Sequence, residues 1–312
     1  KTKDGYEFGF DKLDRWIDMC RRCGIKYFEM SHLFTQWGAE HAPKIVAEVD
    51  GEKKRIFGWE TDADSEEYRD FLHRFAAALT AFIDRKGIRN FCRFHVSDEP
   101  SLEQYEVYKK RADLIAEIFP GFKVIDALSD IEFFDKGAVK YPIPSEDHVE
   151  DFVGKVDEFW TYYCCGQHNK NVPNRFFAMP SARNRILGTL LYKYNATGFL
   201  QWGYNYWYSQ FSKHEIDPFT VTDAGKAFPS GDAFVVYPGE DGQPINSLRF
   251  KVFYDGLQDL AAMRLLESLV GREKALEIAI QDNELTFQKY PHGSSYLLAL
   301  RERVNKAIKE NI

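Results

Sequence analysis

The segment IRNFCRFHVSDEP (residues 88–100) joins an apolar run to two adjacent carboxylates, and it decides how the rest of the chain is interpreted. Residues 89–96 predict a buried strand, and residues 101–119 predict an amphipathic helix. Asp98 and Glu99 therefore fall on a strand-to-helix turn, where α/β folds place reactive groups. From this segment alone the pair fits two roles equally well. It can cap the helix, with Pro100 at the first helical position, or it can perform acid/base chemistry.

The alternation of side chains along this predicted strand favours the second role. Arg93, His95 and Glu99 share one face of an extended backbone, where a run of charged groups is unusual if the strand is buried. Buried charges need partners. We therefore expect a nearby carboxylate cluster to pair with Arg93 and His95.

Strands and helices alternate on both sides of this segment. The predicted strands are 25–30, 89–96, 123–128, 157–161, 198–202 and 233–237, and the main helices between them are 66–85, 101–119, 146–154 and 181–195. This gives about six β–α units and implies a parallel sheet of the α/β class. An open doubly wound sheet has the same alternation. Polar and aromatic residues follow strand after strand, however, which favours a (β/α)8 barrel of the TIM type.

The expected domain organisation is a single barrel domain over residues 1–312, with a helical extension over about 246–312. Because the chain opens on a predicted helix, we expect the first strand or two of the barrel to lie upstream. The sequence begins Lys1-Thr2-Lys3 without a Met or a signal-like segment, and its compartment stays undetermined.

Composition excludes several classes of function. The net charge of −7 argues against nucleic-acid binding, and no apolar run approaches the roughly 18 residues of a membrane span. The five cysteines lack the spacing of a disulfide framework or a zinc site, so no metal and no cofactor are expected. Aromatic residues make up 16% of the chain, and rings beyond the needs of a core often line ligand pockets.

The segment QWGYNYWY (residues 201–208) concentrates these rings directly after a predicted strand. Packing of a hydrophobic corner is one interpretation. The mixture of rings with amides better fits a sugar site, since rings stack on the apolar face of a pyranose and amides bond its hydroxyls. The candidate substrate-binding residues, all in or after loops that follow strands, are His32, Trp37, Tyr162, Trp202, Tyr204, Asn205 and Trp207.

Four segments together resemble glycoside hydrolase family 123, the bacterial β-N-acetylgalactosaminidases. They are HVSDEP (95–100), PSARNRIL (180–187), TGFLQWGYNYW (197–207) and SGDAFVVYPG (230–239). The resemblance implies a catalytic (β/α)8 barrel, which in that family usually follows a β-sandwich, and the present chain is expected to hold the barrel part alone. It also implies a bacterial enzyme, secreted, periplasmic or cytoplasmic.

The resemblance further implies removal of terminal β-linked N-acetylgalactosamine from a glycan or glycolipid, with retention and by substrate-assisted catalysis. By match to the family's pair, Asp98 stabilises the acetamido group and Glu99 is the general acid/base. We expect Asp98 to stay ionised and Glu99 to have a raised pKa. Two alternatives stay open: a non-catalytic carbohydrate-binding barrel, and a hexosaminidase that acts on N-acetylglucosamine.

Overall fold

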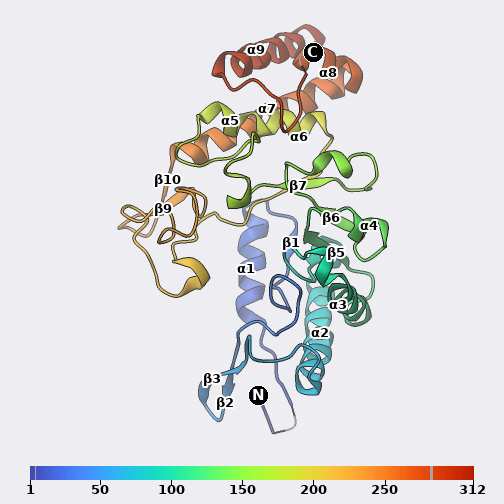
Figure 1. Cartoon of the computed structure of the whole chain (residues 1–312). Helices are drawn as coiled ribbons and strands as arrows, with labels where there is room; N and C mark the ends of the chain where they lie inside the picture. The colour runs from blue at the N-terminus through green and yellow to red at the C-terminus, as the bar shows by residue number, and fades with distance from the viewer. Residues whose placement is uncertain (4, 282–283) are drawn as a thin grey trace. The chain divides into compact units, whose positions relative to one another are not determined.

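The computed structural model describes residues 1–3, 5–281 and 284–312. The chain divides into two compact units, Lys1–Ile143 and Pro144–Ile312, which we call the N-terminal and C-terminal units. Each has its own buried apolar residues and its own parallel strand pairing. Figure 1 shows the elements of both units in chain order.

The N-terminal unit is built on a four-stranded parallel sheet in the order β1-β4-β5-β6. Its strands are β1 (Phe28–Glu29), β4 (Cys92–Phe94), β5 (Lys123–Ala127) and β6 (Tyr141–Ile143), and its antiparallel hairpin is β2 (Ile45–Val49) with β3 (Glu52–Phe57). The helices are α1 (Asp11–Arg22), α2 (Glu66–Lys86), α3 (Tyr105–Ile118) and α4 (Glu132–Asp135), with the single 3-10 turns η1 (Arg89–Phe91) and η2 (Leu102–Gln104). Parallel neighbours need crossover connections, and α2 and α3 provide two of them.

Helix α2 illustrates why these residues form these elements. Its apolar residues recur at helical spacing, so Tyr68, Phe71, Leu72, Leu79 and Ile83 all become buried along one stripe. The helix ends at Gly87, whose φ of 69° lies in the left-handed region that glycine adopts without a steric penalty. The chain then turns directly into η1 and β4, the strand that leads to Asp98.

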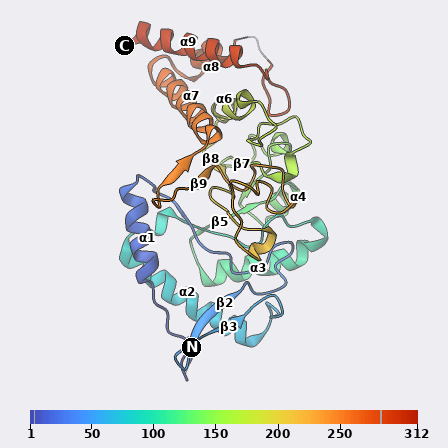
Figure 2. The same cartoon turned by 90° about the vertical axis from the view of Figure 1, so that its left-hand side faces the viewer.

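The C-terminal unit contains a shorter parallel pair and a helical layer. The strands β7 (Trp160–Tyr162) and β8 (Gly198–Leu200) pair in parallel, and β9 (Val236–Pro238) forms an antiparallel hairpin with β10 (Pro244–Asn246). The helices are α5 (Ser181–Arg185), α6 (Leu187–Lys193), α7 (Leu248–Val270), α8 (Arg272–Ile280) and α9 (Ser294–Asn311), with 3-10 turns η3 (Val149–Asp151), η4 (Cys165–Gln167) and η5 (Gln210–Ser212). Figure 2 shows α7, α8 and α9 gathered at the end of this unit, where they contact one another.

Two glycines allow the helices of this unit to approach closely. A β-carbon added at Gly188 of α6 would lie only 1.8 Å from the carbonyl oxygen of Gly256 in α7. A β-carbon added at Gly256 would in turn lie 2.8 Å from the carbonyl oxygen of Arg185. Backbone therefore packs on backbone at this contact, and only glycine fits.

The structure confirms a mixed α/β fold with parallel strands and a helical C-terminal region, but the described residues form no closed barrel. Several predicted elements were wrong in detail, and three of them differ most. Strand 89–96 shrinks to Cys92–Phe94 because residues 89–91 form a 3-10 turn, and helix 146–154 is only the turn η3. Strand 233–237 becomes β9, which is antiparallel and outside the parallel pairing. No helix among the described residues has the length and apolar character needed to cross a membrane.

Candidate active site

Backbone hydrogen bonds hold the Asp98–Glu99 pair between the end of β5 and the loop after β1. The pair follows β4, and the backbone N–H of Glu99 donates to the carbonyl of Ala127 (2.9 Å) at the end of β5. The carbonyl of Asp98 accepts from the N–H of Trp37 (3.1 Å), in the loop after β1. Glu99 has a φ of 46°, in the left-handed region where a non-glycine residue is strained by roughly 1 kcal/mol or more. Such strain persists only where the surroundings fix it.

The following helical turn has its own start signal, and it does not use this pair. Ser101 is the N-cap of η2, and its backbone N–H donates to the side-chain oxygen of Gln104 (2.9 Å) in a capping box. Gln104 is in turn the residue before α3 and donates its amide to the carbonyl of Trp37. Ser101 and Gln104 therefore cap η2. The interpretation of Asp98 and Glu99 as helix-capping residues is wrong.

The carboxyl group of Asp98 has a raised pKa. Burial raises the pKa of Asp98 to about 6, and the negative charge of Glu99 acts in the same direction. The side-chain amide of Gln36 donates to Asp98 (3.4 Å) and opposes the shift in part. From the sequence, Asp98 was expected to stay ionised and Glu99 to have a raised pKa. The structure raises the pKa of Asp98, because the surrounding loops enclose its side chain.

His95 is a buried cation held between two carboxylates. Its Nε2 lies 2.6 Å from Oε1 of Glu29, at the end of β1, and its Nδ1 lies 3.7 Å from Oδ1 of Asp126, in β5. Burial alone would lower the pKa of His95, but the two carboxylates outweigh it and raise the pKa to about 10. His95 is therefore protonated at neutral pH. The prediction of carboxylate partners is confirmed for His95.

Arg93 does not share these partners. Its guanidinium donates to the carbonyls of Asn90 and Cys92, both at 3.1 Å, and stacks over the ring of Tyr27. The prediction of a carboxylate partner for Arg93 is thus wrong. The strand is too short to keep Arg93 and Glu99 on one continuous face.

Asp126 organises the floor of this region. The carboxylate is fully buried and accepts from the backbone N–H of Val96 (3.0 Å) and from the hydroxyl of Tyr108 (2.5 Å). Sequence reasoning missed both Asp126 and Glu29. The available signal was their position: each lies at or near the carboxyl end of a strand that neighbours β4 in the sheet.

His32 lies against His95. The two rings stack with centroids 4.4 Å apart and planes at 15°, and burial together with the charge on His95 lowers the pKa of His32. A neutral imidazole therefore covers a charged one. Of the predicted binding residues, His32 and Trp37 are thus brought beside His95 and the backbone of Asp98.

Glu29, His32 and His95 are also the described group that could hold a metal ion, with ligand atoms within 4.8 Å of one another. The geometry fits an ion pair better. Glu29 and His95 are already in direct contact at 2.6 Å, closer than the roughly 3.4 Å that separates two ligand atoms of a tetrahedral ion about 2.1 Å from each. We derive no chemistry through a metal at this cluster.

The remaining predicted binding residues lie in the C-terminal unit, around the loop that follows β8. Both tryptophans use their indole N–H inside the protein: Trp202 donates to Oδ2 of Asp232 (3.2 Å) and Trp207 to the carbonyl of Val236 (3.0 Å). Tyr204 and Asn205 are exposed, and their backbones pair with residues 234 and 235. Tyr162 ends β7, and its side chain is buried. The loop therefore presents rings and one amide from a fixed backbone.

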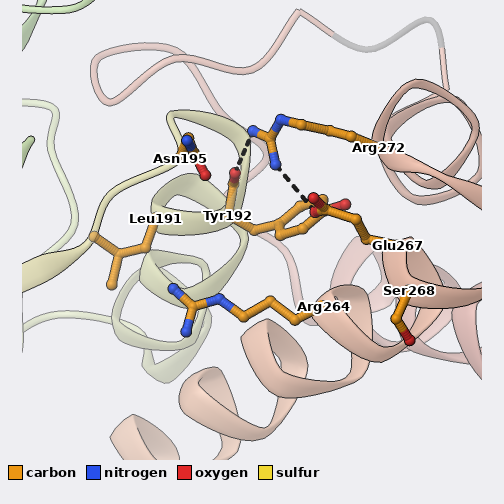
Figure 3. A pocket seen from close by; sticks show the side chains of 7 residues that line it. All are labelled: Leu191, Tyr192, Asn195, Arg264, Glu267, Ser268 and Arg272. Carbon is orange, nitrogen blue, oxygen red and sulfur yellow. Dashed lines mark hydrogen bonds and ion pairs between the residues drawn. The ribbon is translucent and has the colours of Figure 1, made fainter. Parts of the chain in front are cut away.

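A separate pocket in the C-terminal unit has a structural explanation. It is lined by Leu191, Tyr192, Asn195, Arg264, Glu267, Ser268 and Arg272, as Figure 3 shows. Arg272 donates to the carbonyl of Tyr192 (2.9 Å) and pairs with Glu267 (3.2 Å), and Arg264 donates to the carbonyl of Ala196 (3.4 Å). The two arginines thus satisfy carbonyls at and beyond the end of α6.

Comparison with known proteins agrees with the four segments quoted from the sequence. A solved structure of a family 123 glycoside hydrolase from Clostridium perfringens, studied for glycolipid glycan hydrolysis, matches with a TM-score of 0.66 and 17% sequence identity. The match covers 99% of this chain and 56% of that one, so this chain spans just over half the length of its structural relative. No curated protein matches the sequence. The family model for the catalytic domain of glycoside hydrolase 123 matches residues 1–266, and the chain therefore belongs to glycoside hydrolase family 123.

Proposed function

We propose that this chain hydrolyses terminal β-linked N-acetylgalactosamine with retention, by substrate-assisted catalysis at Asp98 and Glu99. The observation that carries the proposal is the adjacent pair itself. It follows β4, Glu99 has a strained backbone, and the next helical turn is capped by Ser101 and Gln104 and not by the pair. The enclosed Asp98 has a pKa of about 6, which is typical of a carboxyl group placed for chemistry. A glycan or glycolipid that ends in a 2-acetamido sugar is the substrate class.

The adjacency of the two acids supports this mechanism over the ordinary one. Glycosidases that use two carboxylates directly place them on either side of the scissile bond, roughly 5 Å or more apart. Neighbours in sequence at one strand end are poorly suited to that task. When the acetamido oxygen of the sugar is the nucleophile, one acid holds the acetamido group and the other transfers protons, and both can act from one side.

In the first step the acetamido oxygen attacks C1, and the C1–oxygen bond to the leaving group breaks as Glu99 donates a proton to that oxygen. Asp98 accepts the hydrogen bond of the acetamido N–H and offsets the positive charge of the resulting oxazolinium ring. In the second step Glu99 takes a proton from water, whose oxygen attacks C1 and reopens the ring. Two inversions at C1 leave the configuration retained.

The aromatic residues supply binding in this proposal. Within the C-terminal unit, Trp202 and Trp207 offer their ring faces to the apolar face of a sugar, Asn205 is placed to bond sugar hydroxyls, and Tyr162 is the donor for an acetamido oxygen. The role of the two tryptophans is supported by their hydrogen bonds. Both indole N–H groups already donate to protein acceptors, so the rings can contact a ligand only through their faces.

The test compares nitrophenyl 2-acetamido-2-deoxy-β-galactoside with its gluco epimer and with the 2-hydroxy galactoside. We expect nitrophenol release from the first and none above background from the last. Glu99→Gln and Asp98→Asn should each lower kcat/KM by roughly 10³-fold or more. Full activity of either variant would exclude the proposed role of the acid that it replaces.

A series of N-acyl groups tests the nucleophile directly. Replacing the acetyl methyl hydrogens by one, two and three fluorines weakens the carbonyl oxygen as a nucleophile, so kcat/KM should fall steeply along the series. A flat series would show that the carbonyl takes no part. Faster cleavage of the gluco epimer would favour the hexosaminidase alternative, and sugar binding without cleavage would favour the carbohydrate-binding alternative.

The closed (β/α)8 barrel and the single-domain organisation remain predictions.

A further inference from the structure

Trp202 and Asp232 form a contact between an exposed ring and a fully buried carboxylate. The indole N–H of Trp202 donates to Oδ2 of Asp232 (3.2 Å), the side chain of Trp202 is 41% exposed, and Asp232 is 0% exposed. Asp232 lies in the segment 230–239, to which the sequence alone assigned no role. The buried end of the contact is therefore fixed, and the exposed end is available to a ligand.

The backbone around this contact is fastened at several points. Buried Arg175 donates to the carbonyls of Gly203 and Asp232 (2.9 Å for the latter), so it ties the residue after Trp202 to its partner. Arg249 donates to the carbonyl of Gly231 (2.5 Å), the residue before Asp232. Two arginines thus hold the chain on both sides of the contact.

The chain after Trp202 also runs against the chain after Asp232. The N–H of Val235 donates to the carbonyl of Tyr204 (2.9 Å), and that of Tyr206 donates to the carbonyl of Ala233 (3.2 Å). A β-carbon at Gly203 would come within 2.8 Å of the carbonyl oxygen of Ala233, so this approach requires glycine. Neither end of the Trp202–Asp232 contact can shift without breaking backbone pairing.

Trp207 provides an internal comparison. Its indole N–H is satisfied by a plain backbone carbonyl, that of Val236, at 3.0 Å. A carbonyl thus suffices to satisfy an indole donor in this loop, whereas Asp232 carries the cost of burying a carboxylate. Burial raises the pKa of Asp232 to about 6, with Arg175, Trp202 and Arg249 opposing the shift. A charged acceptor forms the stronger and more directional hydrogen bond, which matters for a ring whose plane must be held.

We propose that Asp232 is a positioning residue that fixes the plane of the Trp202 indole so that its exposed face stacks on a 2-acetamido sugar. The inference rests on the proposed function and deepens it, because it assigns a residue outside the aromatic loop to sugar binding. Asp232 touches no substrate itself. It acts through the orientation of one ring.

The kinetic test uses three single variants and one double variant of the full chain. Asp232→Ala should raise KM for the nitrophenyl 2-acetamido galactoside roughly tenfold with kcat little changed, because stacking binds substrate and transition state alike. Asp232→Asn keeps an acceptor oxygen and should recover most of the loss. Trp202→Phe removes the N–H donor, so Asp232→Ala should cost almost nothing further in that background.

Indole N–H resonances of protein labelled with ¹⁵N-tryptophan give the structural readout. The resonance of Trp202, identified by its loss in Trp202→Phe, should move upfield in Asp232→Ala and stay near its original position in Asp232→Asn. The resonance of Trp207 is the internal control and should not move. Movement of both resonances would indicate a rearranged loop and would overturn the specific assignment.

Two further outcomes separate this inference from the proposed function. An unchanged KM in Asp232→Ala, or fully additive losses in the double variant, would overturn the positioning role while leaving the hydrolase intact. If the wild-type chain cleaves no 2-acetamido sugar, the proposed function fails. Titration with free N-acetylgalactosamine then decides the inference. Perturbation of the Trp202 resonance with weaker affinity in Asp232→Ala supports it, and no perturbation overturns it.

Discussion

At the scale of residues, the enclosed carboxyl group of Asp98 is less stable as an anion in the folded protein than in the unfolded chain. Its pKa is 3.8 in the unfolded reference and about 6 in the structure. The folded state therefore binds more protons between these two pH values, and stability falls as the pH rises through them. The negative charge that the proposed mechanism uses therefore lowers the stability of the folded protein.

Asp98→Asn should stabilise the protein at pH 7 while it abolishes activity. The expected gain in the free energy of unfolding is about 2–3 kcal/mol, from a shift of roughly two pKa units. Urea unfolding at pH 7 and pH 4 measures it, and the gain should shrink at the lower pH, where wild-type Asp98 is largely protonated. Asp113→Asn, at an exposed partner of Lys109, is the control and should change stability by less than about 0.5 kcal/mol. Equal gains at both pH values would contradict this account.

The charge on His95 should set the acidic limb of the pH profile. Because the proposed mechanism requires an ionised Asp98, kcat/KM should fall as the pH drops below about 6. Asp98 faces the charges of Glu99 and Asp126, which raise its pKa, and of His95, which lowers it. His95→Gln removes the only opposing charge among these three, so the limb should move to higher pH.

Glu29→Gln is the matched variant, since it removes a partner of His95 but leaves the imidazole in place. It should move the limb less than His95→Gln does. A limb that stays in place in both variants would mean that His95 does not influence Asp98.

The sequence allowed Asp98 and Glu99 to be selected as candidate catalytic residues, but it did not reveal their surroundings. Asp98 and Glu99 stand out because they are adjacent and end an apolar run. Glu29 and Asp126 carry no such signal. Each is a single acid in a short strand, and only the sheet order places both beside His95. The raised pKa of Asp98 had no signal in the sequence for a similar reason, because the side chain of Asp98 is enclosed with the help of the separate loop that carries Gln36.

At the scale of elements, the alternation of side chains along a strand gave a wrong prediction because β4 ends earlier than expected. Arg93 and Glu99 were predicted on one face of an extended segment, yet β4 stops at Phe94 and Glu99 turns into the left-handed region. Helix prediction was more reliable. The stripe of α2 is long enough to be recognised, and α2 spans Glu66–Lys86 against a predicted 66–85.

Asp259 should be a major contributor to the stability of the helical layer. This buried residue of α7 accepts two hydrogen bonds from Arg185 of α5 (2.7 and 3.0 Å) and one from Arg301 of α9 (3.0 Å). Asp259→Ala leaves the two arginines without their shared anion, and it should lower the free energy of unfolding by about 3–5 kcal/mol. Chemical denaturation measures the loss.

Arg301→Gln is the control for this prediction. It leaves the bidentate pair of Arg185 with Asp259 intact, so its cost should be much smaller. Similar losses in the two variants would show that the network does not depend on Asp259 as its centre.

At the scale of the whole molecule, alternation of strands and helices correctly predicted parallel pairing, because it depends on connection lengths that a sequence displays. Closure into a barrel is a different property. It depends on strand tilt and stagger around the whole sheet, and strands as short as Phe28–Glu29 encode little of either. The family match likewise ends at residue 266, inside α7, which continues to Val270.

A chain cut at residue 266 should fail to fold stably. Met263 and Leu266 of α7 are fully buried, and α8 and α9, which contact α7, supply buried apolar residues such as Leu297 and Leu300. Removing residues 267–312 would expose these faces and take Arg301 from Asp259. We expect an aggregated product by size-exclusion chromatography. A monomeric product with the thermal midpoint of the full chain would contradict this prediction.

The capping box of η2, formed by Ser101 and Gln104 just before α3, has a practical consequence. Because this turn is capped without help from residues 98 and 99, both acids can be replaced without removing the cap. Inactive variants at the pair should therefore remain intact receptors that retain a glycan without cutting it, which suits them to affinity enrichment and glycan profiling. The same independence of the cap offers an evolutionary route, by which a gene copy that loses two acids passes from hydrolase to lectin without losing its fold.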